Sequence, residues 1–183
     1  MNTAGTAERP AATERAVRTL VVCAGNDLAA DDGLGPAVYR ELRTRTLPPG
    51  TRVFRLGVAS LALLDELAAE DLLLLVDAVQ LGGAPGTLHV LPWDRLPACA
   101  GAAVSLHGIG LRETLAVGQA LFAHRMPRQA TLLGVEGRCF DQLGAPLSPP
   151  VEAALPAVLT EIEDQIERCR SHPAVRSTDD DDA

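Results

Sequence analysis

The sequence predicts an α/β fold: three layers, α/β/α, built on a mixed, mostly parallel five-stranded sheet with one antiparallel edge strand. Two observations predict it. Short apolar runs alternate along the chain with segments whose apolar residues recur at helical spacing. One connection, from residue 78 to 86, is too short for a parallel crossover, so the strand that follows should run antiparallel to its predecessor and lie at an edge. A length of 183 residues suits one such domain.

Five strands are expected, over residues 19–24, 51–56, 72–77, 87–91 (the edge strand) and 130–135. The first and third are apolar runs, as expected of strands buried on both faces.

The expected helices follow from apolar spacing and end signals. Leu34, Val38 and Leu42 recur at helical spacing before a Pro-Pro-Gly stop, and Ser148 with Pro149 is a typical helix start. The remaining helices are expected over residues 60–69 and 105–123, and the last helix should end near residue 170. The domain should therefore span residues 18–170, between a disordered N-terminal segment (1–17) and a disordered acidic tail (171–183).

Composition excludes several partners. The net charge is −8, and all 16 basic residues are arginine, so no lysine chemistry is available. An acidic protein repels phosphates, which argues against nucleic acid and anionic membranes. The four cysteines form no CxxC pair, and no segment is long and apolar enough to cross a bilayer. We expect a cytoplasmic protein that is a monomer or a weak oligomer.

Polar residues gather where parallel strands should end, and that edge is where open α/β sheets place their sites. The segment after the first strand, AGNDLAADDGLG, brings Asn26, Asp31 and Asp32; the third strand ends with Asp77; and His107 lies early in the helix 105–123. Each has a structural alternative. Asp31 and Asp32 are also common residue types at the start of a helix, and Asp77 is a common residue type in a turn. A single histidine such as His107 is more often a packed or exposed side chain than a metal ligand.

The combination indicates a cation site. Two carboxylates and one imidazole form a ligand set for a divalent transition metal, with coordination positions left open. Without a cation, two clustered carboxylates would repel each other. The glycine turn fits neither GxxxxGK[ST] nor GxGxxG, and the chain contains no HExxH or GxSxG. The acidic turn is therefore expected to hold a cation and not a phosphate.

Several short motifs extend this pattern from about residue 19 to 170. In chain order they are Gly25-Asn26, Asp31-Asp32-Gly33-Leu34-Gly35, Val76-Asp77-Ala78, Gly82 to Gly86, Ser105-Leu106-His107, Gly110-Leu111, Gly134-Val135-Glu136 and Leu147-Ser148-Pro149-Pro150-Val151. Each motif is weak by itself, but the ordered set resembles the hydrogenase maturation protease family. Its members are nickel-dependent endopeptidases that remove a C-terminal peptide from the large-subunit precursor of [NiFe]-hydrogenase after nickel insertion.

The resemblance implies roles for the residues at this edge. Asp32, Asp77 and His107 would be the catalytic and metal-binding residues, with nickel supplied by the precursor and zinc or cadmium as other ions that fit. We expect Asp31 to orient Asp32, and Asn26 to fix the turn.

The chain departs from the family at one turn. Many members carry Gly-Thr after the second strand, where this chain has Gly57 followed by Val58-Ala59-Ser60. This departure favours one alternative, a chaperone-like module that binds metal-loaded precursor without cutting it. Another metal-assisted hydrolase is the other alternative.

Overall fold

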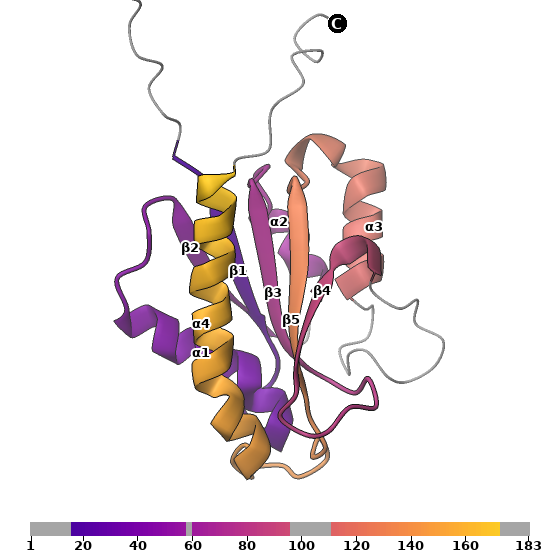
Figure 1. Ribbon diagram of the computed structural model, residues 1–183. Helices are drawn as coiled ribbons and strands as arrows, with labels where there is room; N and C mark the ends of the chain where they lie inside the picture. The colour runs from indigo at the N-terminus through magenta and orange to yellow at the C-terminus, as the bar shows by residue number, and fades with distance from the viewer. Residues whose placement is uncertain (1–15, 58–59, 96–110, 173–183) are drawn as a thin grey trace, which may run out of the picture.

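The computed structural model describes residues 16–57, 60–95 and 111–172. Its centre is a five-stranded sheet in the order β2-β1-β3-β5-β4 (Figure 1). The strands are β1 (Thr19–Ala24), β2 (Thr51–Leu56), β3 (Leu72–Val79), β4 (Leu88–Pro92) and β5 (Gln129–Glu136). Four strands are parallel, and β4 pairs with β5 in the antiparallel direction at the edge. The predicted mixed sheet and its antiparallel edge strand are therefore confirmed.

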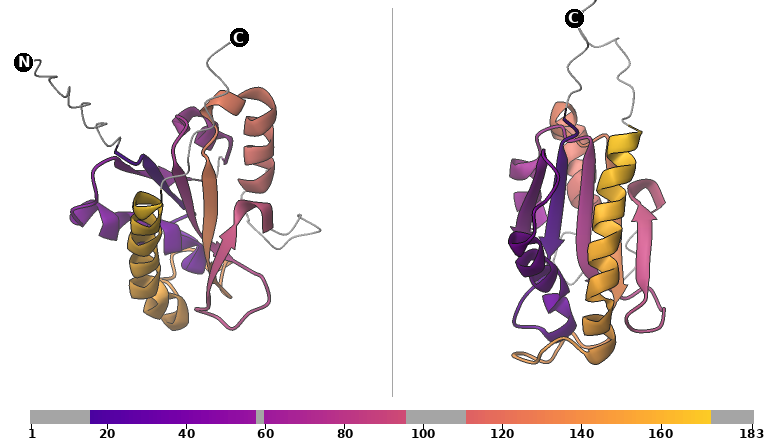
Figure 2. Two further views of the ribbon diagram at one scale, coloured as in Figure 1. Left: turned by 45° about the horizontal axis from the view of Figure 1, so that its top comes forward. Right: turned by 60° about the vertical axis from the view of Figure 1, so that its left-hand side comes forward.

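Helices cover both faces of the sheet. The α-helices are α1 (Leu34–Thr44), α2 (Leu63–Glu66), α3 (Leu111–Leu121) and α4 (Pro149–Ser171), and the 3-10 turns are η1 (Ala30–Gly33), η2 (Ser60–Ala62), η3 (Trp93–Arg95) and η4 (Ala123–Arg125). Two apolar clusters join the layers: one packs α1 and α4 on one face, and the other packs α2 and α3 on the opposite face. Figure 2 shows the sheet between these two layers. The three-layer arrangement matches the prediction.

β3 forms the middle of the core, because every residue from Leu72 to Val79 is buried. Its side chains alternate between the two faces, as the two-residue period of a strand requires. Val76 and Ala78 belong to the cluster beside α1 and α4, whereas Leu75 and Val79 belong to the cluster beside α2 and α3. Asp77 therefore points to the α2–α3 face.

The expected helix over residues 60–69 is shorter in the structure, where η2 leads into a single α-helical turn, α2. Arginine side chains donate hydrogen bonds to backbone carbonyl oxygens that would accept bonds from within a longer helix. Arg125 donates to the carbonyls of Asp65 and Leu67, and Arg52 donates to that of Glu66. Tertiary hydrogen bonds thus replace helical ones, and no local spacing pattern predicts that.

The other element boundaries lie close to prediction. Within the described part of the expected helix 105–123, α3 covers Leu111–Leu121, and α4 ends at Ser171. The segments expected to be disordered, 1–17 and 171–183, fall almost entirely outside the described residues. Among the described helices, none combines the length and the apolar character needed to cross a membrane.

Candidate active site at the carboxyl edge of the sheet

The loops after β1, β3 and β5 meet at one edge of the sheet, at the lower end of the molecule in Figure 1. Because these three strands are parallel neighbours, their carboxyl ends lie together. The η1 turn that follows β1 also contacts β3. This edge is the one at which the sequence placed the candidate residues.

Glycines in the segment after β1 allow backbone to approach backbone. Gly25 has a φ of +131°, and a Cβ atom there would lie 2.1 Å from the carbonyl oxygen of Asp32. A Cβ atom on Gly35 would lie 1.8 Å from the carbonyl oxygen of Ala24, so α1 packs directly against the end of β1. Glycine is needed at these two positions because the turn folds back against its own backbone. Their presence therefore does not indicate a phosphate-binding loop.

Asn26 stabilises the same turn. Its side-chain Oδ1 accepts a hydrogen bond from the backbone N–H of Leu28 at 3.1 Å. The backbone N–H of Asn26 donates to the backbone carbonyl of Asp32, also at 3.1 Å. An Asn side chain that bonds the backbone two residues on is a common turn device. These bonds give the expected turn-fixing role of Asn26 a physical basis.

Asp31 joins two loops that are distant in sequence. Its fully buried carboxylate accepts hydrogen bonds from the backbone N–H groups of Arg138 and Cys139, both at 2.9 Å, and of Ser148 at 2.7 Å. Burial by itself raises the pKa of Asp31, but these hydrogen bonds favour the charged form and hold the pKa below its ordinary value. Asp31 thereby attaches the loop before α4 to η1, the turn that contains Asp32.

Asp32 and Asp77 are both buried at this edge. Their side chains belong to residues that are 4% and 1% exposed, respectively. In the sheet register Asp77 lies opposite Gly134 of β5, and the methyl groups of Val79 occupy the space where a side chain at position 134 would lie. η1, which includes Asp32, contacts β3, which includes Asp77. Water is therefore largely excluded from two carboxyl groups on adjacent segments.

The predicted third ligand, His107, lies outside the described residues. α3 begins at Leu111, shortly after it, and covers the face to which Asp77 points. Among residues 16–57, 60–95 and 111–172, no three His, Cys, Asp or Glu side chains form a group that could hold a metal ion. The ligand set Asp32, Asp77 and His107 thus stays a prediction.

A residue missed as a functional candidate, Glu136, organises the loop after Asp77. Its carboxylate accepts hydrogen bonds from the N–H groups of Leu81 at 3.0 Å and Gly82 at 2.9 Å, and it lies 3.1 Å from Nε2 of His89. Burial raises the pKa of Glu136, but these hydrogen bonds lower it below the ordinary value. The sequence contained one indication of this role: Glu136 directly follows the predicted fifth strand, and an acid buried there needs hydrogen-bond partners.

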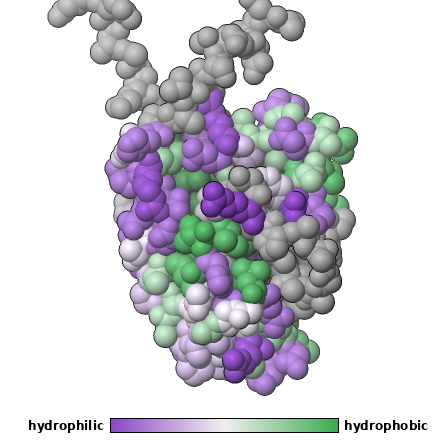
Figure 3. Space-filling view, turned by 45° about the vertical axis from the view of Figure 1, so that its right-hand side comes forward, coloured by the Kyte–Doolittle hydropathy of each residue, from purple (hydrophilic) through white to green (hydrophobic). Residues whose placement is uncertain are grey.

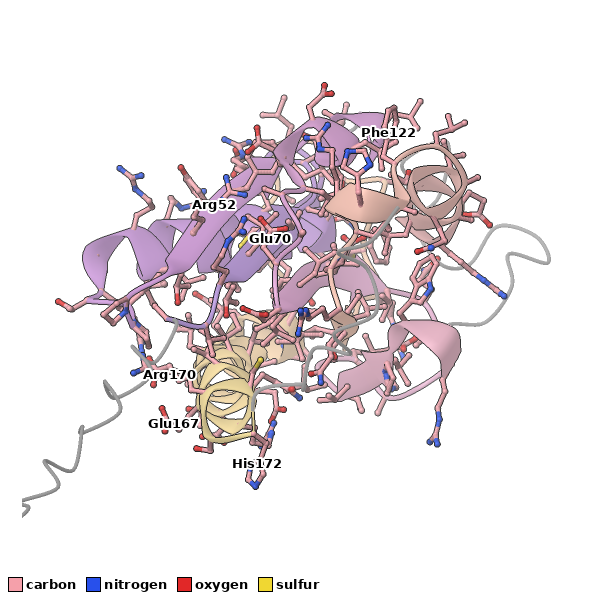
Figure 4. The ribbon with its side chains drawn as sticks, turned by 90° about the horizontal axis from the view of Figure 1, so that it is seen from above. Arg52, Glu70, Phe122, Glu167, Arg170 and His172 are labelled. Carbon is pink, nitrogen blue, oxygen red and sulfur yellow. The ribbon has the colours of Figure 1, made fainter. Side chains whose placement is uncertain are left out.

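Buried acids at the opposite edge have a different role (Figure 4). Glu70 accepts from Arg52 at 2.8 Å and from the N–H of Ala68 at 2.9 Å. Asp71 accepts from the N–H of Arg18 at 2.9 Å, and its Oδ1 lies 3.7 Å from Nε of Arg128. Arginines neutralise this edge. Burial of a carboxyl group is therefore not by itself a sign of chemistry in this fold.

Solved structures share this architecture. The hydrogenase maturating endopeptidase HybD from Escherichia coli superimposes with a TM-score of 0.73 at 29% identity, covering 83% of this chain and 93% of that one. The [NiFe] hydrogenase maturation protease HybD from Thermococcus kodakarensis superimposes with a TM-score of 0.67 at 23% identity, over 82% of this chain and 99% of that one, which is a likeness of fold. The similarity to the Escherichia coli enzyme places this chain in the class of hydrogenase maturation endopeptidases.

Sequence relatives specify the family. The family model described as hydrogenase maturation protease matches residues 36–165. The hydrogenase expression/formation protein HoxM of Azotobacter vinelandii is 36% identical over 152 residues, 81% of this chain and 72% of that protein. The hydrogenase 2 maturation protease of Escherichia coli strain K12 is 32% identical over 149 residues, 80% of this chain and 88% of that protein. The chain belongs to the hydrogenase maturation protease family.

Proposed function

We propose that this chain is a nickel-dependent endopeptidase that removes the C-terminal peptide of a [NiFe]-hydrogenase large-subunit precursor once nickel has been inserted. The observation that carries the proposal is the pair of buried carboxyl groups, Asp32 and Asp77, on segments in contact at the carboxyl edge of the sheet. His107 would complete the set from the segment before α3.

The residues fit a divalent transition metal. Two carboxylate oxygens and one imidazole nitrogen provide three protein ligands and leave positions open for ligands from the precursor. Nickel bound in this way would supply Lewis-acid chemistry at the peptide to be cut. Since Asp32 and Asp77 are shielded from water, a cation would also relieve the repulsion between their charges.

The surrounding residues hold this arrangement. Asp31 attaches η1 to the loop before α4, and Glu136 holds the loop after β3. Asp32 and Asp77 are therefore presented from segments with little freedom to move, as a site requires when its ligands must meet one ion.

The test compares nickel-loaded with nickel-free precursor. Purified wild-type protein should shorten only the loaded precursor by a short C-terminal peptide, measured by mass spectrometry, and Asp32→Asn, Asp77→Asn and His107→Ala should abolish this. Asp71→Asn is a matched control, since it alters a buried acid at the opposite end of β3. Its melting temperature is measured alongside its activity, and the folded Asp71→Asn protein should still cut the loaded precursor.

Other outcomes would contradict the proposal. A stable complex without a change of mass would indicate a chaperone-like module, and no interaction with precursor would indicate a different metal-assisted hydrolase. Processing retained in all three site variants would refute the ligand assignment.

A further inference from the structure

Ala30 has an unusual backbone conformation immediately before the acids Asp31 and Asp32. Its φ is +44°, in the left-handed region that residues with a Cβ atom rarely adopt. Among the described residues other than glycine, Ala30 and Ala69 are the two with a positive φ, and Ala69 has a φ of +56°. A left-handed alanine persists where the surrounding contacts hold it, and such residues are frequent at functional sites.

The contacts on either side of Ala30 explain what holds it. Ala29 forms an isolated antiparallel β-bridge with Leu143, which lies in the loop between β5 and α4. The N–H of Asp31 donates to the carbonyl of Cys139 in the same loop at 2.8 Å. The residue before Ala30 and the residue after it are therefore both bound to one loop. Ala30 must turn the chain sharply between these two fixed points.

We propose that Ala30 is a positioning residue of the candidate site. Its left-handed backbone directs the carboxylate of Asp31 to the loop before α4 and thereby sets the position of Asp32. This inference rests on the proposed function, in which Asp32 is a metal ligand. The requirement at position 30 is for a residue that can adopt a positive φ, and not for a particular side chain.

The backbone of Asp32 is bonded on both sides of Ala30. The N–H of Asp32 donates to the carbonyl of Ala29 at 3.0 Å, and the carbonyl of Asp32 accepts from the N–H of Asn26 at 3.1 Å. The first of these bonds closes directly over Ala30, so it depends on the φ at that position. A different φ at Ala30 would break the bond and move Asp32 relative to Asp77 on β3.

The space beside Ala30 accepts both polar and apolar side chains. Ala30 lines a cavity of about 310 Å³ between η1, α1 and α4, and its lining includes the charged residues Asp27 and Arg40 as well as the apolar Leu147. Figure 3 shows hydrophilic and hydrophobic residues intermingled at the lower end of the molecule, below the apolar patch beside α4. A side chain larger than a methyl group therefore has room at position 30.

Two substitutions of similar size separate the backbone from the side chain. Asparagine adopts the left-handed region more readily than most residues, whereas a β-branched valine is a genuine outlier there. Ala30→Asn should therefore preserve the turn, and Ala30→Val should distort it. Ala30→Gly should also preserve the turn, because glycine adopts a positive φ without steric cost.

Ala69 provides a matched control at the opposite end of β3. Its N–H donates to the carbonyl of Arg125 at 2.8 Å, and the N–H of Ala68 donates to the carboxylate of Glu70 at 2.9 Å. Figure 4 labels Glu70 beside Arg52 at this edge. Ala69 thus has the same backbone state in a structural network of its own, away from the carboxyl edge. Ala69→Val should lower the melting temperature without changing the chemistry.

The experiment measures the turn and the reaction separately. Amide hydrogen exchange of Arg138, Cys139 and Ser148, whose N–H groups bind Asp31, is followed by NMR in each folded variant. In Ala30→Val we expect these amides to exchange about tenfold faster. We expect kcat for nickel-loaded precursor to fall about tenfold to a hundredfold, with KM little changed.

The other variants should behave differently. Ala30→Asn and Ala30→Gly should keep both the amide protection and the kcat of the wild type. Ala69→Val should keep both as well, even though its melting temperature falls. The prediction for Ala30→Asn and Ala30→Gly is decisive even if Ala30→Val does not fold.

Several outcomes would overturn the role of Ala30. One is a folded Ala30→Val variant with wild-type kcat and amide protection. Another is a loss of kcat in folded Ala30→Asn and Ala30→Gly, since both accept a positive φ. An equal loss of kcat in Ala69→Val would assign the effect to general destabilisation. A wild-type chain that never cuts precursor would refute the proposed function instead, and amide exchange in Ala30→Val would still decide whether Ala30 directs Asp31.

Discussion

The carboxylate of Asp31 accepts a 2.7 Å hydrogen bond from the backbone N–H of Ser148, the residue that precedes α4. The same carboxylate also binds the N–H groups of Arg138 and Cys139. One buried side chain therefore connects the turn that contains Asp32 with the loop that contains Leu143. The position of the candidate site therefore depends on this interaction between two loops that are distant in sequence.

Replacing Asp31 should affect stability and activity together. In Asp31→Ala three backbone donors lose their acceptor, and each buried donor left unsatisfied costs about 1–3 kcal/mol. We expect the free energy of unfolding, measured with urea, to fall by about 3 kcal/mol or more. Asp27→Ala is the control, because its exposed ion pairs should contribute only about 0–1 kcal/mol. Equal losses in the two variants would contradict the role of Asp31.

Stability should fall with acid. The folded-state pKa of Asp31 and of Glu136 lies below the ordinary values of 3.8 and 4.5. As the pH drops, the unfolded chain binds these protons first, so their stabilisation is complete above about pH 4.5 and is lost as the pH falls through the lowered values. Urea unfolding at several pH values should show this slope, and the double variant Asp31→Asn, Glu136→Gln should show a flatter one. Identical slopes would exclude these two groups as the cause.

Glu136 should position the loop after β3. In Glu136→Ala the N–H groups of Leu81 and Gly82 and the ring of His89 lose their common acceptor. We expect lower stability and a lower kcat for precursor cutting, with Glu136→Gln restoring part of both because its amide oxygen still accepts. His89→Asn is the control, since it leaves both backbone bonds in place. A folded Glu136→Ala variant with unchanged kcat would show that this loop does not serve the site.

Gly35 should not tolerate a side chain. In a helix alanine is favoured over glycine by about 1 kcal/mol, but a Cβ atom here would lie 1.8 Å from the carbonyl oxygen of Ala24. Relieving that overlap must move α1 away from β1, which we expect to cost about 1–3 kcal/mol beyond the helix gain. Gly57→Ala is the control, because no atom lies within 4 Å of a Cβ atom there. Thermal unfolding tests this: a lower melting temperature of Gly35→Ala supports the close packing of α1 on β1, and a higher one contradicts it.

The cysteines of the core should be unreactive. Cys23 is fully buried in β1, and burial raises the pKa of its thiol to about 12. We expect iodoacetamide at pH 8 to spare Cys23 in the folded protein and to label it in urea, measured by peptide mass spectrometry. Cys23→Ser should lower stability by about 1–3 kcal/mol, because a buried hydroxyl needs a partner, and leave turnover nearly unchanged. Rapid labelling of native Cys23 would contradict its role in packing.

The central strands β1 and β3 were predictable because burial on both faces leaves a local trace, a run of apolar residues. β1 and β2 match the expected residues, and β5 extends the expected strand by one residue at each end. The short helix α2 was not predictable, since its end depends on Arg52 and Arg125, which come from other elements.

The candidate site also has one part that the sequence predicted and another that only the fold reveals. The positions of Asp32 and Asp77 at the end of buried strands followed from the alternation of strands and helices, because parallel neighbours end at one edge. The distinct role of Asp31 did not, since its neighbour Asp32 has the same chemistry and a similar burial. Only the fold brings Arg138, Cys139 and Ser148 to the carboxylate of Asp31.

The sequence by itself therefore determined the layers, the strands and the edge on which acids gather, because apolar periodicity is a local property of the chain. The tertiary structure alone decided which acid joins loops and which acid organises the turn after β3. The bonds of Asp31 join residues more than a hundred positions apart, and those of Glu136 to the turn after β3 join residues about fifty-five positions apart. Local sequence patterns do not encode such contacts.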